Sequence, residues 1–237
     1  MVSGMYRTFV VIVALSAAGC STPGETTNAA REEGSPATPA TGPRVVDFAP
    51  GLRIDYRVPQ VEVDCEVILR EGDLELFAYA KASVPKEHES ILRTRVPPQK
   101  VYQALGLIGL TPGQTLKYLI ETKTVRPASG DKVDVLVRYE KDGETVEESA
   151  CGWMLDAVAK APMKPTHWLF TGSEKMDDGA FAADYEGTLV TVVDFPSSLL
   201  SLPMSHSESD DQLWLKANTQ AIPPVGTSVT LVLRPAK

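Results

Sequence analysis

From about Val45 onward, the chain alternates between apolar and polar residues, which is the period of a half-buried β-strand. The clearest run is VEVDCEVIL, whose apolar positions fall on one face: Val61, Val63, Cys65, Val67 and Leu69. Runs rich in Val, Leu, Thr and aromatic residues predict further strands at THWLFTGS, GTLVTVVDF, QLWLKANT and GTSVTLVLRP. Strands therefore dominate the predicted secondary structure.

Two dipeptides predict tight turns between neighbouring runs. Asp142-Gly143 separates VDVLVRYEK from ETVEESACGW, and Asp-Gly favours the two-residue turn of a β-hairpin. Glu71-Gly72 separates QVEVDCEVIL from LELFAYAK, which predicts a second pair of adjacent strands.

One segment, 98–109, has the period of a helix instead. Its apolar residues lie at i, i+3, i+4 and i+7, on one helical face: Val101, Ala104, Leu105 and Ile108. Pro98 suits the first turn of this helix and Gly109 suits its C-terminal cap. No regular alternation of strand and helix follows, so a parallel doubly wound sheet is not expected. We expect an α+β fold that is mainly antiparallel β, a single domain over 44–237 with one clear amphipathic helix near 98–109.

Residues 1–19 have the composition of a signal peptide. Arg7 precedes an uncharged apolar stretch over 8–18, which is shorter than the roughly 20 residues that a membrane-spanning helix needs. Small residues then lead to Cys20, as in a bacterial lipobox, where the cysteine is acylated and becomes the new N-terminus. Ala17 stands where such a motif usually has Leu or Val. The alternative is cleavage by the ordinary signal peptidase, which would release a free exported protein.

Residues 20–43 predict a flexible tether between that cysteine and the domain. They are rich in Ser, Thr, Pro, Ala and Gly and contain almost no residue that could build a core. A flexible chain of this length spans on the order of 25–30 Å, enough to hold a domain clear of a bilayer. We therefore expect a lipoprotein anchored through Cys20 to a membrane of the cell envelope, facing the periplasm or the exterior.

Composition and charge narrow the choice of partners. The chain is 43% hydrophobic and 23% charged, as expected for a globular protein with an ordinary core. Its net charge of −8 and its lack of a basic stripe argue against nucleic acid as a partner. Since the same charge is repelled by anionic lipid head groups, we expect lipid on Cys20, rather than basic residues, to hold the protein at a membrane.

If Cys20 carries lipid, Cys65 and Cys151 remain, and two interpretations stay open. In an oxidising compartment the two can form a disulfide; alternatively, each is a buried free thiol that packs as a small apolar group. No C-x-x-C spacing is present, so neither an iron–sulfur cluster nor a structural zinc site is predicted. The three histidines are far apart and lack the spacing of metal ligands. We expect no metal and no other cofactor.

The densest group of reactive side chains is KEHES, where Glu87, His88, Glu89 and Ser90 supply acids, an imidazole and a hydroxyl. In an extended segment His88 and Ser90 point to one face and the acids to the other, which is poor geometry for a nucleophile and its base. The segment is a candidate ligand-binding loop at a sheet edge, a candidate acid–base or metal-dependent centre, or a structural turn. A concave pocket around His88 would favour catalysis, and a convex, solvated His88 would count against it.

Six stretches, in this order, resemble the YdjY domain family of bacterial envelope proteins: LREGDLELFAYA, KEHESIL, VYQALGLIGLTPG, WLFTGS, ADYEGTLVTVVDFPSSLLSLP and PPVGTSVTLVL. Together they cover roughly Val58 to Pro235. The resemblance implies an exported protein. It also implies, for some members, an association with ferredoxin-type iron–sulfur modules, of which this chain contains none. It supplies no catalytic or binding residue that can be transferred to this sequence.

These observations lead to one main hypothesis and two alternatives. The main hypothesis is a lipid-anchored envelope protein whose YdjY-like domain binds or organises an unknown protein partner without chemistry of its own. The first alternative is a metal-dependent or acid–base enzyme centred on KEHES. The second is an accessory to an iron–sulfur electron-transfer system.

Overall fold

The structure, a computed structural model, describes residues 45–83, 85–206 and 213–237. These residues belong to one compact unit, Thr41–Lys237. Cys20 and the predicted segments 1–19 and 20–43 lie outside the described residues. Within the described ranges, no helix is both long and apolar enough to cross a membrane.

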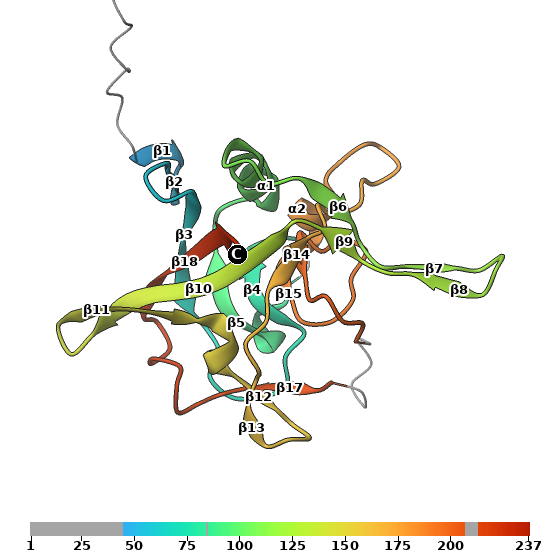
Figure 1. Ribbon diagram of the computed structural model, residues 1–237. Helices are drawn as coiled ribbons and strands as arrows, with labels where there is room; N and C mark the ends of the chain where they lie inside the picture. Colours follow the sequence, from blue (N-terminus) through green and yellow to red (C-terminus); the bar gives the residue numbers. More distant parts are fainter. Residues whose placement is uncertain (1–44, 84, 207–212) are drawn as a thin grey trace, which may run out of the picture. The chain divides into compact units, whose positions relative to one another are not determined.

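Eleven strands form one large sheet (Figure 1). They are β1 (Val45–Ala49), β2 (Leu52–Asp55), β3 (Gln60–Val67), β4 (Leu76–Ala80), β5 (Ser90–Thr94), β10 (Lys132–Lys141), β11 (Glu144–Ser149), β14 (Trp168–Phe170), β15 (Thr188–Thr191), β16 (Leu200–Ser201) and β18 (Ser228–Pro235). Their order is β1-β2-β3-β18-β10-β14-β16-β15-β4-β5, with β11 paired to β10. Because β3 also pairs with β5, the strand order returns to β3. Most neighbours are antiparallel; β4–β5 and β15–β16 are parallel.

The remaining elements are short. Three small sheets contain β12 (Met154–Asp156), β13 (Ala161–Pro162) and β17 (Leu215–Ala217); β6 (Pro112–Gln114) and β9 (Ser129–Gly130); and β7 (Lys117–Leu119) and β8 (Thr124–Arg126). The helices are α1 (Pro98–Leu107) and α2 (Ala182–Glu186), with 3-10 turns at Glu87–Glu89 and Ala150–Trp153.

The expected α+β class is wrong, because this part of the chain is mainly β. Strands account for 44% of the described residues and helical turns of all kinds for 12%. Helix α1 turns Val101, Ala104 and Leu105 to the core and packs against β2 and β3. It makes no helical layer of its own. The apolar faces of the strands bury one another across the core, so the fold does not need a layer of helices to cover the sheet.

The two predicted turns have different outcomes. The hairpin at Asp142-Gly143 is confirmed, since Lys141 pairs with Glu144 and the two turn residues have φ angles of 53° and 82°. The predicted pairing across Glu71-Gly72 is wrong. Strand β3 pairs with β2, β18 and β5, whereas β4 pairs with β15 and β5.

One continuous hydrophobic core lies beneath the large sheet. Its largest fully buried side chains include Trp153, Trp168, Phe77 and Phe170. A smaller cluster of Leu76, Val193 and Phe195 lies apart from it. On the strands that enclose the core, every second side chain points away from it, and these side chains form the outer face of the sheet.

Candidate functional site

Strands β3, β18 and β10 turn apolar residues to the core and polar residues outward. On β3, Val61, Val63, Cys65 and Val67 are buried, and acidic residues alternate with them. Residues directly opposite in an antiparallel pair share a face of the sheet. Thr230 of β18 lies opposite Asp64 of β3 and also opposite Arg138 of β10. A row of polar side chains therefore crosses the outer face.

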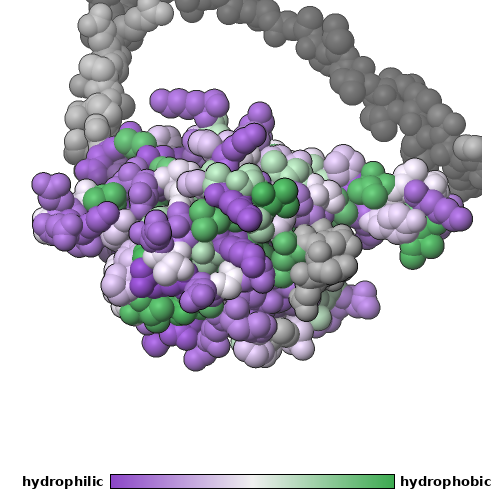
Figure 2. Space-filling model, turned by 90° about the horizontal axis from the view of Figure 1, so that it is seen from below, coloured by the Kyte–Doolittle hydropathy of each residue, from purple (hydrophilic) through white to green (hydrophobic). Residues whose placement is uncertain are grey.

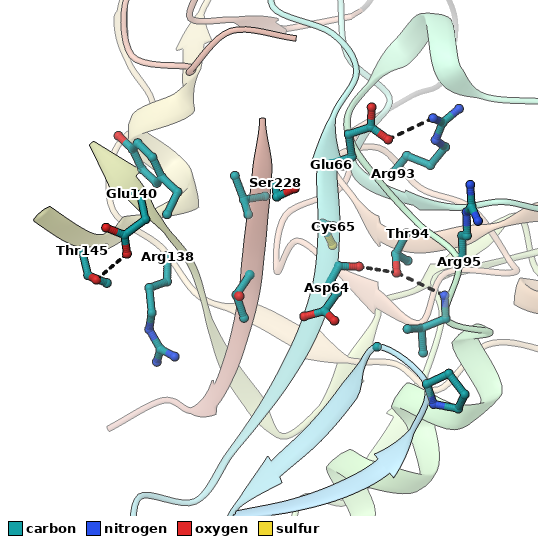
Figure 3. A pocket seen from close by; sticks show the side chains of 16 residues that line it. Asp64, Cys65, Glu66, Arg93, Thr94, Arg95, Arg138, Glu140, Thr145 and Ser228 are labelled. Atoms are coloured by element: carbon teal, nitrogen blue, oxygen red, sulfur yellow. Dashed lines mark hydrogen bonds and ion pairs between the residues drawn. The ribbon is translucent and has the colours of Figure 1, made fainter. Parts of the chain in front are cut away.

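A groove with a volume of about 720 Å³ lies over this face (Figure 3). Its floor comes from β3, β18 and β10, including Ser228 and Thr230. The turn at 50–51 and the residues 93–96 of β5 and its continuation line one side, and Glu140 with Thr145 of the β10–β11 hairpin line the other. The groove is open, and hydroxyl and charged groups line its floor.

Most charges at the groove are already neutralised by ion pairs. Arg138 reaches Glu62 at 2.8 Å and Glu147 at 2.8 Å, and Arg53 reaches Asp64 at 2.8 Å. Burial acts to raise the pKa of Glu62, but the hydrogen bonds and charges of Arg138, and then of Arg53, outweigh burial and lower that pKa. Glu62 therefore stays ionised, and these ion pairs link β3 to β2 and β10 to β11 and β3.

Arg95 is different from the other cations of the groove. It is exposed, and no residue in the described ranges forms an ion pair or a side-chain hydrogen bond with it. Its neighbour Arg93 contacts Glu66 at 3.1 Å and Glu87 at 3.0 Å. The groove therefore presents one uncompensated positive charge at its edge, from residues that sequence reasoning did not single out.

The KEHES segment forms a 3-10 turn that leads into β5, and this turn divides its side chains between two places. Glu87 faces the groove side, where it pairs with Arg93. Lys86 and Glu89 face the opposite way, toward Glu75. The segment is therefore a junction between the groove and a second polar cluster.

That second cluster, which we call the Glu75 cluster, consists of Glu75, Lys86 and Glu89. The Lys86 Nζ lies 3.2 Å from Glu75 and 2.8 Å from Glu89, and 4.5 Å from the ring centre of Phe195. Burial and then the charge of Glu89 raise the pKa of Glu75 to about 6, while Lys86 acts in the other direction. The parallel pairing of β4 and β5 brings these carboxylates together, because the Glu75 amide donates to the Glu89 carbonyl at 3.2 Å.

His88 and Ser90 do not join this cluster as a catalytic pair. The His88 side chain is 78% exposed, and its Nε2 lies 3.6 Å from Glu89. Ser90 is fully buried opposite Leu76, and its Oγ has no hydrogen-bond partner among the described residues. Because His88 is solvated rather than enclosed in a pocket, the structure counts against catalysis centred on this residue. Neither the groove nor a smaller cavity of about 280 Å³ beside α1 is lined by Glu75, Lys86 or Glu89.

The sequence around Glu75 contains a sign that this acid has a partner. In DLELF this acid stands between two leucines, Leu74 and Leu76, that are both fully buried. An acid inside such a run needs a partner, because an unpaired charge is costly to bury. That partner could not be identified without knowing that β4 lies beside β5.

The comparison with known families gives a single result. The model of the YdjY domain matches residues 52–234, which include the groove and the Glu75 cluster. The chain belongs to the YdjY domain family. No curated protein and no solved structure matches it.

The two cysteines of the YdjY domain are both free and buried. Cys65 faces the core from β3, and burial raises the pKa of its thiol to about 12. The Cys151 thiol lies in the turn at Ala150–Trp153, 3.8 Å from the carbonyl oxygen of Thr166. In the described part of the YdjY domain, no group of three or more His, Cys, Asp or Glu side chains is arranged to hold a metal ion.

Proposed function

We propose that this YdjY domain is a binding module that takes a polar ligand with an anionic group into the groove over β3, β18 and β10. The observation that carries the proposal is Arg95, an exposed guanidinium at the edge of the groove without a partner among the described residues. A guanidinium presents a planar set of donors that matches a carboxylate or phosphate. The hydroxyl groups of Ser228 and Thr230 on the floor, and of Thr145 on one side, offer further hydrogen bonds.

Binding fits the groove better than catalysis does. The acids that line it already have partners: Asp64 and Glu66 pair with Arg53 and Arg93, and Glu140 accepts a hydrogen bond from Thr145. Cys65, the only thiol at the groove among the described residues, is kept protonated by burial. An open, polar surface with one unpaired guanidinium at its edge is suited to holding an anionic ligand in one orientation.

The proposal is tested by NMR titration of the ¹⁵N-labelled domain with matched probes. Glucuronate is compared with glucose, and N-acetylalanine with its amide, so that each pair differs in a carboxylate. The carboxylate probes should shift the amide signals of Asp64, Arg95 and Thr230, and Arg95→Gln should remove these shifts. Arg126→Gln is the matched control, because Arg126 is exposed outside the groove. The proposal fails if groove amides respond to neither carboxylate, or if Arg95→Gln responds as the wild type does.

We propose further that Cys20 carries the lipid that places the domain at a membrane of the cell envelope, where it meets a protein partner. The support is the apolar stretch over 8–18, the small residues before Cys20 and the Ser/Thr/Pro/Ala-rich segment after it. Cys20→Ala should move the protein from the membrane fraction to the soluble fraction and abolish labelling by a palmitate analogue. Unchanged fractionation would contradict lipid anchoring without bearing on the groove.

A further inference from the structure

The hairpin of β7 and β8 stands apart from the large sheet. The two strands pair only with each other, through Lys117–Arg126, Tyr118–Val125 and Leu119–Thr124. Every residue from Lys117 to Arg126 is exposed. Figure 1 shows the hairpin projecting from the body of the domain as an arm. Such an exposed, two-stranded arm adds no core to the domain and needs another explanation.

The arm carries large apolar side chains that have nothing to cover them in the described structure. Tyr118 and Val125 lie directly opposite each other and are 55% and 53% exposed, and Ile120 in the turn is 81% exposed. Figure 2 shows hydrophobic and hydrophilic residues side by side at the end of the molecule where the arm projects. Isolated exposed apolar residues are common, but this arm carries four within ten residues, with Leu119, on the other face of the hairpin, as the fourth.

The charges of the arm are opposite in sign to those of the whole chain. The arm contains three basic residues, Lys117, Lys123 and Arg126, and one acid, Glu121, in a protein whose net charge is −8. Lys117 and Arg126 are directly opposite each other, an arrangement of like charges that weakens a strand pair. Of these three, Lys117 alone has an acidic partner in the described part of the chain, Glu174 at 3.4 Å. The arm therefore concentrates positive charge beside apolar side chains.

We propose that this arm binds the surface of an anionic phospholipid bilayer, with Ile120, Leu119 and Tyr118 entering the head-group region and the basic residues contacting phosphates. Lysine and arginine stems lie along apolar surface while their charged ends stay at the interface, and tyrosine favours the same depth. Polybasic and apolar groups together are the usual pair of signals for interfacial binding. The inference does not depend on the groove or on Cys20.

Charge favours a bilayer over a second copy of the chain, because a twofold contact between two arms would place their lysines and arginines against one another. The acidic body of the domain does not prevent this binding. Residues 117–126 form two three-residue strands and their turn, and half of this length reaches roughly 16 Å at about 3.3 Å per residue. That reach exceeds the Debye length of about 8 Å at physiological salt, so the acidic body would be largely screened from the lipid charge.

The test is co-sedimentation of the chain from Ser21 onward, which keeps the whole compact unit Thr41–Lys237 and lacks both the apolar N-terminus and Cys20. The vesicles are phosphatidylcholine with about one quarter phosphatidylglycerol, and pure phosphatidylcholine as the uncharged comparison. The protein should bind the anionic vesicles, less so as salt is raised, and Ile120→Asp and Lys123→Glu should each weaken binding about tenfold.

Val158→Asp is the matched control, since Val158 is 87% exposed on the turn between β12 and β13 and should bind as the wild type does. Three results would overturn the proposal. One is equal binding to charged and uncharged vesicles, and another is wild-type binding by Ile120→Asp. The third is a change in the sedimentation coefficient of the free protein on Ile120→Asp, which would assign the arm to a second copy.

Discussion

Glu75 and Glu89 both pair with Lys86 at a partly buried position. The single positive charge of Lys86 can compensate only one of the two carboxylates. The raised pKa of Glu75, about 6, expresses this imbalance. Sequence reasoning singled out Glu89 within KEHES but neither Glu75 nor the sharing of Lys86. Both glutamates can be read from the sequence, but they lie close together only because β4 and β5 pair in parallel, and local patterns do not encode that pairing.

Replacing Glu75 with Gln should make the stability of the domain less dependent on pH. The folded-state pKa of about 6 lies above the ordinary value of 4.5, so the folded protein binds more protons than the unfolded chain between these values. The contribution of Glu75 to stability is therefore present below about pH 4.5 and is lost as pH rises through about 6. Allowing for solvent screening, Glu75→Gln should gain about 1 kcal/mol at pH 7.

Thermal unfolding followed by circular dichroism from about pH 4 to pH 7 measures this effect. The control is Glu71→Gln, which removes an exposed acid a few residues away and should reproduce the wild-type pH profile. If the profile of Glu75→Gln runs parallel to that of the wild type, Glu75 does not titrate as the geometry indicates.

Ser90 is a buried hydroxyl without a partner among the described residues, and Thr94, on the same strand, is a buried hydroxyl with two. Thr94 Oγ1 donates to the Asp64 carbonyl at 2.7 Å and accepts from the Val96 amide at 3.1 Å. Ser90→Ala should therefore leave the free energy of unfolding unchanged or raise it by up to about 1 kcal/mol, whereas Thr94→Val should lower it by about 1–2 kcal/mol. Urea denaturation distinguishes them, and an equal loss in both variants would mean that Ser90 Oγ has a partner after all.

At the scale of the elements, turn dipeptides correctly predicted a hairpin between strands that adjoin the turn, but not which distant strands pair with each other. Asp142-Gly143 defined a hairpin because both strands of the pair flank the turn. Glu71-Gly72 lies in a longer connection between Val67, where β3 ends, and Leu76, where β4 begins, so it does not hold the two strands together, and both pair with other strands. The same long-range closure explains why one predicted helix did not make the fold α+β.

Substitutions at Gly187 and Gly143 separate two contributions to stability, the packing between elements and the backbone conformation. Both have left-handed φ angles, 78° and 82°. A Cβ on Gly187 would overlap the carbonyl oxygen of Ala80 and the ring of Tyr79, whereas one on Gly143 would meet nothing within 4 Å. We expect Gly143→Ala to cost about 1 kcal/mol, from the left-handed conformation alone. Gly187→Ala should cost at least about 3 kcal/mol, because β4 and α2 must also move apart.

Equilibrium denaturation of the two variants gives the comparison. Equal losses would show that the contact between Gly187 and β4 is looser than the structure has it. A retained circular dichroism spectrum in Gly143→Ala establishes that a left-handed glycine can be replaced in this fold without loss of structure.

For the molecule as a whole, the groove illustrates the limit of sequence reasoning. Asp64, Arg95, Arg138 and Thr230 lie far apart in the chain, and each looks like an ordinary solvated strand residue. Only the order β5-β3-β18-β10 places them around one cavity. What the sequence predicted correctly is the alternation that sends these residues outward and the family to which the chain belongs.

The closure of the strand order also determines how the two buried thiols become reactive. Cys65 and Cys151 are 8% and 1% exposed and lie on different elements of one core. Both should therefore react only when the domain unfolds globally.

In the chain from Ser21 onward, labelling by a thiol reagent at pH 8 should be slow for both cysteines and should accelerate with urea in parallel with unfolding. Cysteine introduced at the exposed position of Val158 should react at once and calibrates the reagent. Faster labelling of one native thiol would reveal local opening, and a Cys65–Cys151 disulfide formed by mild oxidant without urea would contradict a closed core that keeps the two thiols free.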